Sequence, residues 1–223
     1  MIPLRRMITI AQNHGWIIQD PFVDYSISAE STERDYLTKD EIRQMMDLKF
    51  RRKSMELVQD LYVFCCFTGL SFTDMKNLTK DNVQTSFDGK LWIMTKRQKT
   101  GAESNIMLMD IPLRIIEQYD GMAKENYLLP VPQYMTAFKN LKTIIGLCGI
   151  EKNITWHPSR YTMATEICLT NGVPIETLSK MLGHTNIRTT QIYAKTTHEK
   201  ESRDTNTLSD KLSKIEQFSG ITI

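Results

Sequence analysis

The string His157-Pro158-Ser159-Arg160 begins the most informative part of this 223-residue chain. Leu182-Gly183-His184-Thr185 follows it, and Thr189-Thr190-Gln191-Ile192-Tyr193 ends it. The histidine and arginine of the first string are three residues apart, so on a helix they share one face. A single tyrosine or histidine on a helix is more often a core residue than a functional one. The ordered set at these spacings is far more specific than any one of its residues.

The rest of the chain predicts a mainly α fold with a small antiparallel β-sheet. Thr38 with Glu41 three residues later forms a capping-box pattern at a helix start. Gly69 ends the strongly apolar run before it. Helical patterns cover residues 2–18, 38–48, 54–68, 71–78, 112–122, 134–148, 157–171, 174–182 and 186–196. Residues 91–94 and 106–108 read as strands, with turns at Asp88-Gly89 and Lys99-Thr100-Gly101.

Composition limits the class of protein. Hydrophobic residues make up 41% and charged residues 24%, which is ordinary for a globular protein and excludes global disorder. No run of apolar residues is long enough for a transmembrane helix, and no signal-peptide core follows Arg5 and Arg6, so we expect a cytoplasmic protein without a membrane partner. The net charge of +2 allows a nucleic-acid partner only if basic residues cluster.

The four cysteines predict buried, reduced thiols. They are Cys65, Cys66, Cys148 and Cys168, and none of them forms a CxxC pair. The four histidines and four cysteines do not fall at metal-ligand spacing, so we predict neither a metal nor another cofactor.

The three strings together resemble the catalytic half of the tyrosine recombinases, also called phage-type integrases. The resemblance extends over about residues 35–200. Thr68-Gly69-Leu70 matches the segment that begins the family's active site, and Lys99-Thr100-Gly101 matches its β-hairpin lysine. Asp74 stands where the family has a Glu or Asp.

The resemblance implies a role for each residue. Tyr193 would attack a DNA phosphodiester and hold it as a 3′-phosphotyrosyl ester. Arg160 would bind the phosphate, since a planar guanidinium suits its developing charge. His157 and His184 would be phosphate ligands or proton carriers, and Lys99 the general acid for the leaving 5′ oxygen. Asp74 would orient its neighbours, and Lys96 competes with Lys99 for the acid role.

The chain departs from the family at Ser71, where an arginine should follow Thr68-Gly69-Leu70. Integrases of conjugative transposons and related elements from Bacteroides-type bacteria are similar in this respect. Three interpretations stay open: the protein is inactive, it is slow, or another arginine fills the place. Arg97 is our candidate, because residues two apart on a strand point the same way and Lys99 follows at that spacing. The alternative role for Arg97 is a DNA-backbone contact.

The resemblance also implies an organisation. Residues 1–20 would be the C-terminal helix remnant of a core-binding domain, 21–35 a linker and 36–200 the catalytic domain. Residues 201–223 would form a tail that packs on a neighbouring protomer or folds back on its own. Its apolar stripe contains Leu208, Leu212, Ile215 and Phe218.

We therefore expect a site-specific recombinase that integrates or excises a mobile element through a Holliday junction. Its partners would be double-stranded DNA attachment sites, three further protomers in a homotetramer on DNA, and accessory DNA-bending proteins, while the free protein would be a monomer. It would associate with the bacterial nucleoid when active. The alternatives are a multimer resolvase, a type IB topoisomerase-like enzyme, and a non-catalytic DNA-binding relative. Ser71 favours the last of these, whereas the intact tyrosine, arginine and histidines oppose it.

Overall fold

The computed structural model describes residues 2–25, 35–194, 205, 206 and 209. It divides the chain into two compact units, Met1–Glu33 and Arg34–Ile223. The predicted tail stripe lies outside the described residues. Within the part that is described, no helix is long and apolar enough to cross a membrane.

The first unit is built around helix α1 (Ile2–Asn13). This helix is shorter than the predicted range of 2–18, because Gly15 adopts a left-handed φ of 70°, a conformation that ends helices. The chain then turns back, and the Arg5 guanidinium donates a hydrogen bond to the Tyr25 carbonyl at 2.6 Å.

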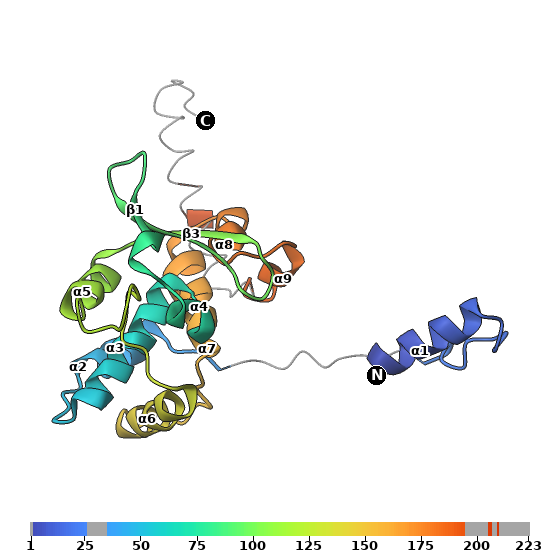
Figure 1. Ribbon diagram of the computed structural model, residues 1–223, viewed down its shortest axis with the longest axis horizontal. Helices are drawn as coiled ribbons and strands as arrows, with labels where there is room; N and C mark the ends of the chain where they lie inside the picture. The colour runs from blue at the N-terminus through green and yellow to red at the C-terminus, as the bar shows by residue number, and fades with distance from the viewer. Residues whose placement is uncertain (1, 26–34, 195–204, 207–208, 210–223) are drawn as a thin grey trace, which may run out of the picture. The chain divides into compact units, whose positions relative to one another are not determined.

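The second unit contains a mainly helical body with one small sheet (Figure 1), which confirms the predicted fold class. Its first helices and its strands are α2 (Lys39–Asp47), α3 (Lys53–Thr68), α4 (Phe72–Lys76), the 3-10 turn η1 (Lys80–Asn82), β1 (Val83–Thr85), β2 (Leu91–Lys96) and β3 (Glu103–Met107). The later helices are α5 (Asp110–Gln118), α6 (Tyr134–Leu147), α7 (Pro158–Thr162), the π-helix η2 (Met163–Cys168), the 3-10 turn η3 (Leu169–Asn171), α8 (Ile175–Met181) and α9 (Arg188–Gln191).

Helix α3 forms the centre of the core. It packs against α2, α5, α6 and α7, and side chains such as Val58, Leu61 and Phe64 are fully buried on it. All four cysteines are buried and free, as predicted. A helix that is apolar on every side must be covered on every side, so α3 fixes the positions of its neighbours.

The sheet is antiparallel in the order β1-β2-β3, and β2 pairs with β3 from Trp92 opposite Met107 to Lys96 opposite Glu103. Figure 1 shows it running across one end of the helical body, where β3 packs against α8. The hydroxyl of Ser104 in β3 donates to the Met181 carbonyl at the end of α8. The sheet therefore holds its β2–β3 turn against the segment that follows α8.

Two predicted helices in the second unit also differ from the structure. The range 157–171 is not one α-helix: α7 has five residues and passes into the π-helix η2. The Thr162 hydroxyl donates to the Pro158 carbonyl at 3.2 Å, and such a bond competes with the regular backbone ladder. Within the described residues, α9 covers only Arg188–Gln191 of the predicted range 186–196.

Candidate active site

The end of α3 provides the floor of the site. Gly69 terminates the helix with a left-handed φ of 67°, and its N–H donates to the Cys65 carbonyl. A Cβ atom at this position would lie 2.9 Å from Cδ2 of Leu182, so both the conformation and the close approach require glycine. The Gly69 carbonyl is left free to accept a bond from α7.

Arg160 of α7 is the charged residue at the centre. Its side chain is 2% exposed. Nη1 donates to the Gly69 carbonyl, and Nη2 donates to the Leu182 carbonyl at 2.7 Å. Burial lowers the pKa of the guanidinium, and the charge of Arg97 lowers it further. Two neutral carbonyl groups therefore orient this side chain without neutralising its charge.

His184 lies beside Arg160 in the turn after α8. Its Nε2 is 3.4 Å from Nη2 of Arg160, and its Nδ1 is 2.8 Å from Oγ1 of Thr190. A guanidinium can only donate, so we assign the imidazole proton to Nδ1, which then donates to Thr190. Burial, with the charges of Arg160 and Arg97, lowers the pKa of His184 from 6.5 to about 4. The ring is therefore neutral at pH 7.

Tyr193 lies next to this histidine and is 5% exposed. Its ring stacks on His184 with centroids 6.1 Å apart, and Tyr161 meets it edge-on at 4.5 Å. Tyr161 in turn contacts the ring of His157 at 5.7 Å. Burial raises the pKa of the Tyr193 phenol, while the positive charges of Arg160 and Arg97 act in the opposite direction. The four aromatic rings form a continuous row.

Arg97 reaches the same site from the sheet. Its Cβ is 3.4 Å from the position that a Cβ on Gly183 would occupy. Its charge adds to the effect of burial in lowering the pKa of both Arg160 and His184. Its Nε is buried and, among the described residues, has no hydrogen-bond partner. The structure therefore brings Arg97, Arg160, His184 and Tyr193 together.

The predicted strand alternation of Arg97 and Lys99 is wrong. Strand β2 ends at Lys96, so Arg97 lies just beyond it and Lys99 lies in the turn, where strand alternation does not apply. Two other contacts direct Arg97: Oδ1 of Asp74 accepts the backbone N–H of Gln98 at 3.0 Å, and the Thr100 hydroxyl donates to the Gly183 carbonyl at 3.2 Å.

Ser71 has a structural place of its own. Its hydroxyl oxygen accepts the Asp74 N–H at 3.1 Å as the N-cap of α4, and the hydroxyl donates to Oδ2 of Asp74 at 2.7 Å. The spacing of a serine and an acidic residue three positions later is a capping pattern that the sequence already contained. Asp74 thus connects the start of α4 to the backbone beside Arg97.

Lys99 and His157 lie further out. Both side chains are exposed, as is that of Lys96 at the end of β2. The structure gives Lys99 no ion pair or hydrogen bond within the described part of the chain. His157 stands at the N-cap of α7, directly before the helix that carries Arg160.

Sequence reasoning missed several partners in the site. Thr190, which is fully buried, and Tyr161 were not identified as site residues, although both stand inside or beside the quoted strings. The carbonyls of Gly69 and Leu182 could not be found from residue types, because every residue has a carbonyl group.

The family model described as the phage integrase family matches residues 35–200. The chain belongs to the phage integrase family. The predicted family resemblance is thereby confirmed.

Similar proteins agree with this assignment. A tyrosine recombinase of Pseudothermotoga lettingae is 27% identical over 165 residues, covering 71% of this chain and 55% of that protein. The tyrosine recombinase XerD of Oceanobacillus iheyensis is 24% identical over 214 residues, covering 86% of this chain and 70% of that protein. This integrase-family chain thus spans between about half and 70% of these two relatives.

The fold is also that of solved integrases. The structure of the Tn1549 transposon integrase in complex with transposon right end DNA superposes with a TM-score of 0.67 at 16% identity. The match covers 90% of this chain and 75% of that one. At this identity the comparison establishes the fold.

Proposed function

We propose that this protein cleaves and rejoins DNA strands in site-specific recombination. One observation carries the proposal: Arg97 and Arg160 converge beside Tyr193 and a neutral His184, and neither arginine is paired with a carboxylate among the residues that the structure describes. Arg160 is buried and Arg97 is partly buried, and two such cations that repel each other are costly unless an anion joins them. A phosphodiester is such an anion, and guanidinium groups match its geometry.

The proposed chemistry follows from these positions. Oη of Tyr193 attacks the phosphorus, the new O–P bond forms, and the bond from phosphorus to the 5′ oxygen breaks. Arg160 and Arg97 stabilise the charge that develops on the non-bridging oxygens. Lys99 gives its proton to the departing 5′ oxygen, with Lys96 as the alternative donor. Attack by a 5′ hydroxyl on the phosphotyrosyl ester reverses the step and rejoins the strand.

The histidines have different environments in this scheme. The low pKa of His184 makes it a weak base, so we assign it to holding Arg160 and Tyr193 in place while it is neutral. His157 is exposed at the start of α7 and can accept the phenol proton or bind the phosphate. Asp74 orients the backbone beside Arg97 and does not react.

The remaining features of the proposal concern the whole protein. Residues 1–20 would end a core-binding domain, 21–35 would be a linker, 36–200 would be the catalytic domain, and 201–223 would form a tail that lies outside the described residues except for 205, 206 and 209. The Tn1549 neighbour, which binds transposon DNA, supports a role in a mobile element. Double-stranded attachment sites, a homotetramer on DNA, accessory DNA-bending proteins and a place in the bacterial cytoplasm belong to the same proposal.

Covalent trapping tests the reaction. The 223-residue chain is incubated with a pool of duplexes of randomised sequence, each with a 5′-bridging phosphorothiolate at its centre, and is then run on a denaturing gel. Tyr193→Phe is the matched control, because it removes only the hydroxyl. We expect an adduct with the unchanged protein alone. Sequencing the captured strands then yields a duplex for the later assays.

An adduct that persists in Tyr193→Phe would show a different nucleophile. If no adduct forms although a gel shift shows that the pool is bound, the protein is a non-catalytic DNA-binding relative. Relaxation of a supercoiled plasmid without strand exchange between two duplexes would instead favour the topoisomerase-like alternative.

A further inference from the structure

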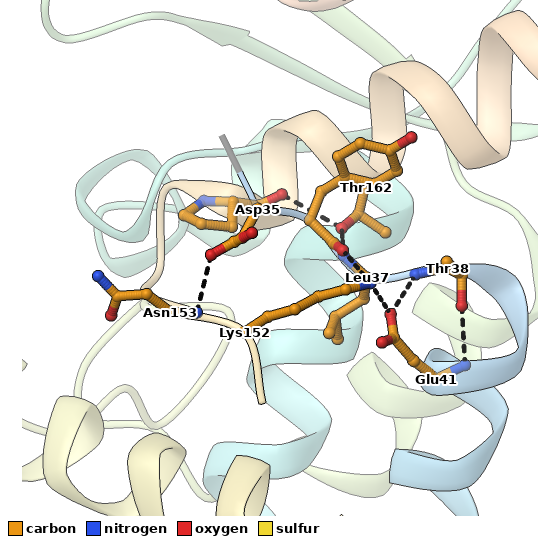
Figure 2. Close-up of polar contacts among 9 residues, drawn as sticks. Asp35, Leu37, Thr38, Glu41, Lys152, Asn153 and Thr162 are labelled. Atoms are coloured by element: carbon orange, nitrogen blue, oxygen red, sulfur yellow. Dashed lines mark hydrogen bonds and ion pairs between the residues drawn. The ribbon is translucent and has the colours of Figure 1, made fainter. Parts of the chain in front are cut away.

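The first described residues of the second unit form a strap that contacts α7, the helix that carries Arg160. We define the strap as Asp35–Thr38 (Figure 2). It contacts the chain at two places, Lys152 and Asn153 on one side and Thr162 on the other. The site pair His157 and Arg160 lies between these two places in the sequence.

The contact with Thr162 is buried. The Leu37 N–H donates to Oγ1 of Thr162 at 3.0 Å, and both residues are fully buried. The same hydroxyl donates to the Pro158 carbonyl at 3.2 Å. One hydroxyl therefore joins the strap to both ends of α7, the five-residue helix that carries Arg160. A buried N–H needs an acceptor, so this contact cannot be lost without cost.

The second contact holds the loop that leads into α7. Nζ of Lys152 donates to the Tyr36 carbonyl at 3.1 Å and to Oε2 of Glu41 at 2.6 Å. The Asn153 N–H donates to Oδ2 of Asp35 at 2.9 Å. Figure 2 shows the side chain of Lys152 extending beneath the strap toward Glu41.

Glu41 connects this network to α2. The same Oε2 accepts the Thr38 N–H at 2.8 Å, which completes the predicted capping box. Burial opposes the charged form, but the bonds from Lys152 and Thr38 lower the pKa of Glu41 overall. The strap is thus fixed to the start of α2, which follows it directly, and to the two places that bracket His157 and Arg160.

We propose that the strap sets the position of Arg160, with Thr162 and Lys152 as its positioning residues. This inference rests on the proposed function for its consequence, the rate of strand cleavage. The chain enters the strap from its N-terminal side at Asp35. Grip on DNA by an upstream domain would therefore pull on the segment that brackets His157 and Arg160, and so would tune the site.

A small displacement is enough for a large effect. A misplacement of about 1 Å between reacting groups can cost about 100-fold in rate. Arg160 is held by two carbonyl groups from other segments, so a shift of α7 would lengthen both bonds and move its charge away from His184.

Thr162→Val tests the proposal, since valine has nearly the shape of threonine and lacks the hydroxyl. Thr143→Val is the matched control: the Thr143 hydroxyl also donates to a carbonyl four residues earlier, that of Lys139 at 3.1 Å, but on α6. Thr162→Ser restores the hydroxyl. Lys152→Met serves as a second probe, because its partly exposed position makes the variant less disruptive to folding.

The first readout needs no DNA. The pKa of His184 is followed by NMR titration, since burial together with the charge of Arg160 holds it at about 4. We expect it to rise toward 6.5 in Thr162→Val and Lys152→Met, and to stay unchanged in Thr143→Val and Thr162→Ser. An unchanged His184 pKa in both probes would overturn the inference, whatever the protein does to DNA.

The second readout is the single-turnover cleavage rate at saturating amounts of the captured duplex. We expect a decrease of roughly tenfold or more in Thr162→Val, with the DNA dissociation constant within about twofold of the unchanged protein. Serine should restore the rate. Loss of affinity at a constant cleavage rate would contradict a positioning role. If the unchanged protein forms no adduct, the proposed function fails, and the titration of His184 still decides whether the strap positions Arg160.

Discussion

Replacing Arg97 with alanine should slow cleavage strongly while the fold stays intact. Arg97 stands within the electrostatic reach of Arg160, His184 and Tyr193, and its buried Nε has no partner among the described residues. Loss of one preorganised donor to a developing oxyanion costs about 3–4 kcal/mol, which corresponds to a decrease in rate of about 10²–10³. We expect a decrease in this range for Arg97→Ala.

Arg97→Ala should not lower the stability of the fold, although it lowers the rate of cleavage. The charge of Arg97 acts with burial to lower the pKa of Arg160 and of His184, so in the absence of DNA it disfavours the positive forms of both groups. Removing it relieves a repulsion. The melting temperature of Arg97→Ala should therefore equal or exceed that of the unchanged protein, as is common where a site is built for function.

The assay measures adduct formation in a single turnover at saturating DNA, with thermal unfolding in parallel. Arg97→Lys is the control, because it keeps the charge and loses the planar fork, and we expect an intermediate rate. Cleavage at the rate of the unchanged protein in Arg97→Ala would refute the assignment. A fall in rate that accompanies unfolding would refute the argument about stability.

Ser71→Arg should restore part of the activity of Arg97→Ala. The restoration is limited, because Ser71 caps α4 and bonds to Asp74, and loss of such a cap costs about 1 kcal/mol. A double variant with no more activity than Arg97→Ala would show that position 71 no longer faces the phosphate.

Three further predictions concern neighbouring residues. The pKa of His184 falls from 6.5 to about 4 on folding, so between these two pH values the unfolded chain binds more protons than the folded protein. In denaturant titrations, the free energy of unfolding should therefore fall by about 1 kcal/mol when the pH is lowered from about 7 to about 5.5, and His184→Gln should lose this dependence. Thr190→Val leaves the imidazole N–H without its acceptor and should destabilise by about 1–3 kcal/mol in the same experiment, whereas Thr190→Ser should not. Lys99→Met should slow cleavage of an ordinary phosphodiester but not of the 5′-bridging phosphorothiolate, because a thiolate leaves without an acid; if Lys96→Met behaves this way instead, Lys96 is the donor.

The parts of the fold that could be predicted from the sequence depend on short-range chemistry. The capping box of Thr38 and Glu41, the end of α3 at Gly69 and the turn at Gly89 each involve residues within a few positions of one another. Such patterns determine where an element begins or ends. They say little about its interior, so the π-helix η2 was read as part of a regular α-helix.

The parts of the site that could not be predicted depend on long-range backbone geometry. Arg160 bonds to the carbonyls of Gly69 and Leu182, which are 91 and 22 residues away in the sequence. The sequence predicts Arg97 as a site residue from a strand alternation that the structure does not have. Arg97 reaches the site because Asp74 accepts the N–H of Gln98 and so fixes the backbone next to it. The residue types indicate which side chains gather in the site. The contacts that orient these side chains involve backbone carbonyl and amide groups, which nearly every residue carries and which the sequence therefore does not single out.

The use of carbonyl groups to hold Arg160 has a chemical consequence. A carboxylate in the same position would bond more strongly to the guanidinium, but it would also neutralise the charge that a phosphate has to meet. The two carbonyl groups accept one bond each from Nη1 and Nη2 and leave the charge, whereas the buried Nε has no partner among the described residues. Burial of this charge lowers the pKa of Arg160. The Asp74 carboxylate instead accepts hydrogen bonds from the Ser71 hydroxyl and from the backbone N–H of Gln98. The site therefore keeps its positive potential for an external anion. Under the proposed function, this preorganisation would let a chain with serine at position 71 offer two guanidinium groups to a DNA phosphate.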